Sequence, residues 1–193
     1  TIAKTDIKSV RIGTNVTSLA ANAFNTCNAM ESVTIPNTVT SLGLGSFLNC
    51  SSLQSVTIPD SVTTLYSYAF YNCSSMVSIS ISNSITKIER EAFDGCSSLL
   101  SVTIPDGVTE IQEQAFDNCT TLNSVTIGNN VSIIGNVAFR NTIFTTVTLP
   151  DSITSISASG FLGSNLTTAY MSSSTAARLN FFIGSTVTLG GKE

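Results

Sequence analysis

Residues 53–75 read LQSVTIPDSVTTLYSYAFYNCSS, and the stretch that follows, 76–98, reads MVSISISNSITKIEREAFDGCSS. The two stretches carry the same kind of residue at nearly every position, and the pattern continues on both sides of them. When the repeats are written one below another, equivalent positions form columns. One column contains a cysteine every 23 residues, at Cys27, Cys50, Cys73, Cys96 and Cys119, and another contains a phenylalanine, at Phe24, Phe47, Phe70, Phe93, Phe116 and Phe139. A fixed period in this range is typical of a solenoid, in which one supersecondary unit stacks on copies of itself. Because each coil contacts only its neighbours, the sequence predicts one elongated domain.

Each repeat contains a triplet such as Val56-Thr57-Ile58, in which two aliphatic residues flank a polar one. This alternation predicts a short β-strand with its aliphatic side chains inside and its central residue outside. A proline and an Asp or Asn follow most triplets, as in Pro59-Asp60, and favour a corner because proline lacks a ladder N–H and an Asx side chain bonds nearby backbone. A second aliphatic pair and the phenylalanine complete the inner wall. We therefore expect a mainly β repeat solenoid, a right-handed coil with parallel strands and about seven turns.

The repeat changes near the C-terminus, where the period slips by one residue and Thr142 replaces the cysteine. We expect the solenoid to cover residues 1–171 and an atypical capping unit to cover 172–193. Within the cap, the sequence favours a short helix at about 175–182 and a strand at 187–189. The first residues of the chain already have repeat-like sequence and no signal segment precedes them, so we expect a mature or trimmed fragment.

Composition excludes several classes of function. The net charge is −4, whereas nucleic-acid binding needs a basic stripe that displaces counterions from phosphate. No stretch approaches the roughly 18 apolar residues that cross a bilayer, so we expect no direct membrane insertion of this fragment. The chain has no histidine, no G-x-S-x-G elbow and no phosphate-binding loop. We expect no enzymatic activity, no catalytic residues and no cofactor.

The cysteine column has three interpretations. Adjacent members would have Cα atoms about 5 Å apart, which is within disulfide range, but stacked side chains point in one direction and five thiols leave one unpaired. Metal binding is a further alternative. We favour small buried hydrophobes, because free cysteine packs well in a core. Asp60, Asp106 and Asp151 are expected to form turns, and a Ca²⁺ ladder there would need more oxygen ligands per ion. No metal site is predicted.

The unit from Leu99 to Cys119 resembles the BspA-type leucine-rich repeats of bacteria and protists, whose signature is roughly L-x-x-V-x-I-P-x-x-V-x-x-I-x-x-x-A-F-x-x-C. The similarity covers about residues 7–170, with departures at Ser82 and Gly128 in the proline column. It implies a leucine-rich-repeat coil in an extracellular, secreted or surface-anchored protein that adheres to other proteins, either of a host matrix or of a neighbouring cell. The motif is a scaffold motif, so the resemblance supplies no functional residue.

Two outward surfaces are candidates for binding. The first-strand face is lined by serines and threonines that hardly vary between coils, which is more typical of strand propensity than of a ligand site. The positions between the second aliphatic pair and the phenylalanine do vary, and there the sequence places Tyr66, Tyr68, Tyr71, Glu89 and Arg90. Tyrosine and arginine are frequent anchors of protein interfaces. We therefore predict that these five residues form the partner-binding site.

Three functions fit these observations. The leading hypothesis is a non-enzymatic adhesion module, because a long rigid surface provides many spread contacts. The second is an architectural stalk that holds another domain away from a cell. The third is a carbohydrate-binding solenoid, in which tyrosine rings would meet the sugars of glycans.

Overall fold

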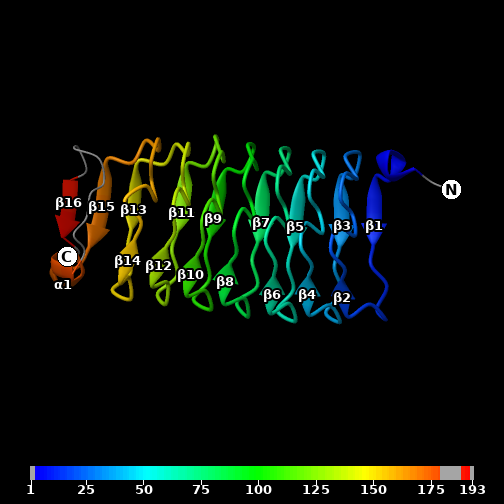
Figure 1. Cartoon of the computed structure of the whole chain (residues 1–193), viewed down its shortest axis with the longest axis horizontal. Helices are drawn as coiled ribbons and strands as arrows, with labels where there is room; N and C mark the ends of the chain where they lie inside the picture. Colours follow the sequence, from blue (N-terminus) through cyan, green and yellow to red (C-terminus); the bar gives the residue numbers. More distant parts are fainter. Residues whose placement is uncertain (1–2, 179–187, 192–193) are drawn as a thin grey trace.

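The computed structural model describes residues 3–178 and 188–191, and these form a parallel β-solenoid of about 7 turns (Figure 1). Each turn from β1 to β14 carries one three-residue strand and one two-residue strand on opposite sides of the coil. The coils follow one another along the long axis of the molecule, from the blue N-terminal turn to the orange C-terminal one. The predicted fold class is confirmed, and the handedness of the coil stays a prediction.

The longer strands form one wall, which we call the first-strand face. They are β1 (Ser9–Arg11), β3 (Ser32–Thr34), β5 (Ser55–Thr57), β7 (Ser78–Ser80), β9 (Ser101–Thr103), β11 (Ser124–Thr126), β13 (Thr146–Thr148), β15 (Thr168–Met171) and β16 (Thr188–Gly191). The shorter strands form the opposite wall: β2 (Ser18–Leu19), β4 (Ser41–Leu42), β6 (Thr64–Leu65), β8 (Lys87–Ile88), β10 (Glu110–Ile111), β12 (Ile133–Ile134) and β14 (Ser155–Ile156). The strand pairings among the described residues are parallel, and equivalent residues of neighbouring coils face each other, as Val10 faces Val33.

The strands begin one residue earlier than the triplets predicted. In β5 the paired residues are Ser55, Val56 and Thr57, with Val56 inside and its two neighbours outside. The next residue, Ile58, is buried but belongs to the corner. Inward and outward positions are therefore as predicted, and the strand limits are the same where no proline follows, as in β7.

The core consists of columns of like residues. The rings of Phe47, Phe70, Phe93, Phe116 and Phe139 are fully buried. Successive rings stack nearly parallel, with centroids 5.1 Å apart for Phe47 and Phe70 and 5.5 Å apart for Phe70 and Phe93. Such contacts repeat between neighbouring coils, so stability accumulates along the axis and no single element contains the core.

The C-terminal region contains a helix, α1 (Ser173–Arg178), and the strand β16, which pairs with β15. The helix begins two residues before the predicted start, and the predicted residues 179–182 lie outside the described part. Of the predicted strand 187–189, residues 188 and 189 belong to β16, and residue 187 lies outside the described part. Ser172 Oγ accepts a hydrogen bond from the N–H of Thr175 at 3.3 Å, which explains the earlier start because a serine favours the position just before a helix. The division of the chain at residues 171 and 172 stays a prediction.

Candidate functional site

The predicted site lies on the flank where each coil turns from its second strand to its phenylalanine. We call this flank, residues 43–49 and their equivalents in other coils, the turn face. One of its columns adopts a left-handed backbone in six consecutive coils, with φ between 45° and 60°: Asn22, Gly45, Tyr68, Glu91, Gln114 and Val137. This conformation aims the N–H at the next coil, so that Tyr68 N–H donates to Arg90 O at 3.1 Å and Glu91 N–H donates to Glu113 O at 3.1 Å. These bonds hold a conformation that most side chains disfavour.

The three tyrosines of the predicted site have different roles. Tyr66 is 46% exposed and projects from the turn face. Tyr68 and Tyr71 are half-buried, and their rings lie 5.9 Å apart at an angle of 59°. The hydroxyl of Tyr68 donates to Glu91 Oε1 at 3.2 Å. Tyr68 therefore helps to hold adjacent coils together, and Tyr66 alone of the three is well exposed.

The two predicted charged residues also differ. Glu89 is half-buried and its Oε2 accepts hydrogen bonds from the backbone N–H and the hydroxyl of Ser67, at 2.8 and 2.9 Å. Arg90 keeps 51% of its side chain exposed, although its Nε lies 3.0 Å from Glu91 Oε1 and 3.9 Å from Glu113 Oε2. Glu89 is therefore used internally, and the partner-binding role of the five residues stays a prediction.

Sequence reasoning missed an exposed residue that completes the patch. Leu44 is 47% exposed and occupies the same column as Arg90, two coils earlier. Hydrogen bonds between backbone groups join neighbouring coils here, and one of them runs from Gly45 N–H to Ser67 O at 3.0 Å. Leu44, Tyr66 and Arg90 thus lie on three successive coils, and we call these three residues the exposed anchors. The sequence did contain a sign of this exposed residue, because Leu44 stands alone between two glycines at a turn position.

Sequence reasoning also missed a buried ionic network beside the tyrosines. Asp94, Asp117 and Arg140 occupy the column of Tyr71 in the following coils. Asp117 is fully buried, and its two carboxylate oxygens accept hydrogen bonds from Nε and Nη2 of Arg140, the Nε bond being 2.9 Å long. Asp94 is buried too, and its Oδ1 accepts a hydrogen bond from Asn118 Nδ2 at 3.1 Å. Removing Arg140 would leave the buried charge of Asp117 without this partner, which is strongly destabilising in such pairs.

The network shifts several proton equilibria. Burial raises the pKa of the Asp94 carboxyl to about 6, with repulsion from Asp117 and Glu91 adding to the effect. The hydrogen bond from Asn118 and the charge of Arg140 oppose this shift of the pKa. The pKa of Tyr71 is raised as well. Burial is the main cause, and the negative charges of Asp94, Glu91 and Asp117 add to it. The carboxylates therefore make this part of the turn face a locally negative environment.

The corner aspartates Asp60, Asp106 and Asp151 lie in turns, as predicted, but the carboxylates of Asp60 and Asp106 bond outside their own corner. Asp60 Oδ1 accepts a hydrogen bond from the N–H of Asn83 at 3.3 Å, and Asp106 Oδ1 accepts one from the N–H of Asn129 at 2.6 Å. Both partners lie in the next coil and not in the same corner. The Asx column therefore links coils, because stacking brings the next backbone N–H within reach of each carboxylate.

The cysteine column lies in the core, as predicted. All five cysteines are buried and free. Burial raises the pKa of each thiol, to about 12 for Cys50 and Cys96. Within the described residues no group of three His, Cys, Asp or Glu side chains is arranged to hold a metal ion. A search of the same residues finds no helix that is both long and apolar enough to cross a bilayer.

Comparisons with known proteins agree with this architecture. A family model described as the BspA type Leucine rich repeat region matches residues 2–123 and 86–188, with 6 copies of the repeat. Among curated protein sequences, none matches the chain significantly.

Several solved structures have a similar fold. A leucine-rich repeat protein from Bacteroides ovatus superposes with a TM-score of 0.70 at 23% identity, covering 97% of this chain and 52% of that one. One from Eubacterium ventriosum superposes with a TM-score of 0.75 at 27% identity, covering 83% of this chain and 44% of that one. A leucine rich cell surface protein from Faecalibacterium prausnitzii gives a TM-score of 0.50 at 24% identity, with coverages of 93% and 61%. The chain thus spans about half the length of the first two relatives.

Proposed function

The chain belongs to the BspA-type leucine-rich repeat family, and from this premise we propose that it is a non-enzymatic adhesion module that binds proteins at a cell surface or after secretion. Repeat scaffolds of this kind present an extended surface on which contacts are spread over many coils. One relative of the same fold is described as a leucine rich cell surface protein, which supports a surface location. The partners we expect are proteins of a host matrix or of a neighbouring cell.

The observation that carries this proposal is the arrangement of the exposed anchors. Leu44, Tyr66 and Arg90 project from successive coils, with exposed fractions of 47%, 46% and 51%. The backbone beneath them is fixed by hydrogen bonds between coils, among them Tyr66 N–H to Leu42 O at 3.0 Å. A rigid, pre-formed surface loses little conformational entropy on binding, so aromatic and arginine anchors can contribute most of their contact energy.

The proposal is tested by exposing the immobilised chain to a panel of purified matrix proteins and measuring affinity for those that bind. Tyr66→Ser removes one anchor without touching the core. The matched control is Leu100→Ser, because Leu100 has nearly the same exposure, 47%, but precedes β9 on the first-strand face. We expect Tyr66→Ser to weaken binding about tenfold, as one anchor contributes about 1–2 kcal/mol. The control should bind like the unmodified chain.

The choice of variants follows from the contacts on the turn face. Tyr68 is left in place because its hydroxyl is bonded to the buried Glu91, so a change there would alter stability and binding together. Equal affinity of Tyr66→Ser and the control would contradict the proposed site and direct attention to the first-strand face. If no matrix protein binds at all, the stalk function becomes the better interpretation.

A further inference from the structure

The first-strand face is not one continuous sheet. Strands β1, β3, β5 and β7 form one sheet, β9 and β11 a second, and β13, β15 and β16 a third. The coils stay joined on the turn face, where Phe116 N–H donates to Ala138 O at 2.8 Å. The break between β11 and β13 therefore opens the wall on one side of the solenoid while the other side remains closed.

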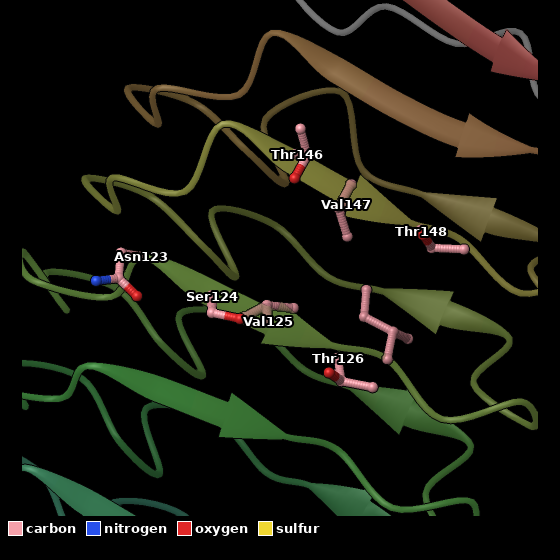
Figure 2. A pocket seen from close by; sticks show the side chains of 8 residues that line it. Asn123, Ser124, Val125, Thr126, Thr146, Val147 and Thr148 are labelled. Carbon is pink, nitrogen blue, oxygen red and sulfur yellow. The ribbon is translucent and has the colours of Figure 1, made fainter.

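A cleft of about 270 Å³ lies at the break between β11 and β13 (Figure 2). Its lining comes from both strands and their ends: Asn123, Ser124, Val125, Thr126 and Ile127 on one side, and Thr146, Val147 and Thr148 on the other. Figure 2 shows the two strands running beside each other with these side chains around the gap. Asn123, Ser124, Thr126, Thr146 and Thr148 are exposed, so the cleft is open to solvent.

The repeat sequence changes next to this break. The step from Thr126 to Thr148 is one residue shorter than the step from Thr103 to Thr126 in the preceding coil. Phe144 occupies the inward column that holds leucine or methionine elsewhere, and its ring meets Phe139 edge-on, at 5.8 Å and 85°. Thr142, which replaces the cysteine, donates to Phe139 O in its own coil, whereas the cysteine thiols donate to the coil before. A shorter turn, a larger ring and a lost bond between coils thus coincide with this break, whereas the break between β7 and β9 has none of the three.

The open strands leave backbone groups without their usual partners. In four coils the residue after the strand donates to the next coil, as Ile104 N–H does to Thr126 O at 2.8 Å. The equivalent bond from Ile127 N–H to Thr148 O is missing from the described residues. The same bond is missing from Ile35 N–H, inside an unbroken sheet, and from Ile81 N–H, at the break between β7 and β9, but only Ile127 of these three residues lines the cleft. Backbone donors and acceptors pair with protein groups or with water, so these two groups at the cleft are available to a polar ligand.

The chemistry of the lining restricts the ligand class. Hydroxyls of serine and threonine both donate and accept, the amide of Asn123 does the same, and none of the eight lining residues is charged. An anion or a cation would find no opposite charge here. The volume is slightly below the range of about 300–1,000 Å³ that is usual for small-molecule sites, which suits one compact polar unit.

An aromatic ring stands beside the cleft on the same face. Tyr170 on β15 is in register with Thr148 and is 40% exposed. The equivalent position carries serine or threonine in the coils of β3 to β13, so this tyrosine is an exception in its column. An aromatic face next to hydroxyl and amide groups is complementary to a pyranose, whose C–H face packs on a ring while its hydroxyls form hydrogen bonds.

From these observations we propose that the cleft between β11 and β13 binds one neutral pyranose unit of a glycan, with Tyr170 as its stacking platform. The site is separate from the exposed anchors and does not depend on the protein-binding function. The sugar hydroxyls replace the missing hydrogen bonds of Ile127 N–H and Thr148 O. The remainder of the glycan extends over the hydroxyl-lined first-strand face.

The test uses NMR of the ¹⁵N-labelled chain titrated with methyl glycosides of glucose, galactose, mannose and N-acetylglucosamine. At least one should bind in the millimolar range and shift the amide signals of residues 123–127 and 146–148. Thr126→Val together with Thr148→Val removes two hydroxyls while keeping the β-branched shape, and should weaken binding about fivefold or more. Tyr170→Ser should have a similar effect.

Matched controls separate the cleft from the rest of the molecule. Thr57→Val alters the same outward column in β5, which is paired with β7, and should leave the binding unchanged. Tyr66→Ser removes a tyrosine of similar exposure on the turn face and should also be without effect. Circular dichroism should show that every variant keeps the β-solenoid. The proposal is wrong if none of the four glycosides shifts the cleft amides, if the shifts map to the turn face, or if the cleft variant binds like Thr57→Val.

Discussion

The thiol of Cys73 donates a hydrogen bond to the backbone carbonyl oxygen of Phe47, with an Sγ–O distance of 3.2 Å. Phe47 belongs to the preceding coil, and the same bond recurs from coil to coil: Cys50 to Phe24, Cys96 to Phe70 and Cys119 to Phe93. The cysteine column is thus a ladder that joins coils as well as a filling of the core. This second role needs the S–H proton, because a thiolate cannot donate.

The thiols should be unreactive in the native chain. Burial raises their pKa, to about 12 for Cys50 and Cys96, so the reactive thiolate is scarce even at pH 9. A thiol reagent should modify few cysteines under native conditions and all of them after denaturation without reductant. A shortfall in denaturant would reveal a disulfide, and rapid modification of the native chain would contradict the buried position of the column.

Asp94 should make stability fall as the pH rises. Its pKa of about 6 in the folded chain lies above the ordinary value of 3.8, so its contribution is fully present below pH 3.8 and is lost as the pH passes through about 6. Asp94→Asn keeps an acceptor for Asn118 and removes this dependence. Between pH 5 and pH 7.5 the unmodified chain should lose about 1–2 kcal/mol of unfolding free energy relative to the variant, allowing for solvent screening.

Urea denaturation at the two pH values measures this difference. Asp60→Asn is the matched control, because Asp60 is an exposed corner carboxylate that also accepts a hydrogen bond. Its effect on the unfolding free energy should be the same at both pH values. A pH response of Asp94→Asn equal to that of the unmodified chain would show that another group causes the dependence.

The left-handed column of the turn face should favour glycine. Gln114 has φ of 57°, a conformation in which a Cβ is unfavourable. Gln114→Gly and Gln114→Ala both remove the long side chain, and they differ in the Cβ alone. We expect the glycine variant to be more stable than the alanine variant by about 1 kcal/mol in urea denaturation. The reverse order, which is usual at positions with negative φ, would mean that the backbone of this turn is not left-handed.

The sequence by itself determined the repeat, the stacked core columns and the family. A strict period leaves little freedom, because every inward position of one coil must meet the same position of the next. The alternation around Val56 was enough to separate inside from outside, although the strand limits moved by one residue. The buried location of the cysteines followed in the same way from their unbroken column.

The candidate site was predicted less completely. The variable positions were correctly located, yet of the five proposed residues Tyr66 and Arg90 are the most exposed, whereas Glu89 bonds to Ser67 in the preceding coil. Leu44 joined the patch because stacking places it two coils from Arg90 in the same column. A side chain on the turn face can point into solvent or bond to the adjacent coil, and the repeat pattern does not specify which of the two it does.

The tertiary structure alone decided three further features: the left-handed turns, the Asp117–Arg140 pair and the cleft beside β13. Each depends on contacts between coils that the pattern of one repeat does not contain. The turns are stabilised by carbonyl groups of the next coil, and the ion pair joins equivalent positions of adjacent coils. The cleft lies where the repeat is one residue shorter and where Phe144 packs edge-on against Phe139 and Phe161. A period fixes which residues are stacked, while the spacing between stacked strands is set by the volume and hydrogen bonding of the side chains that fill each coil.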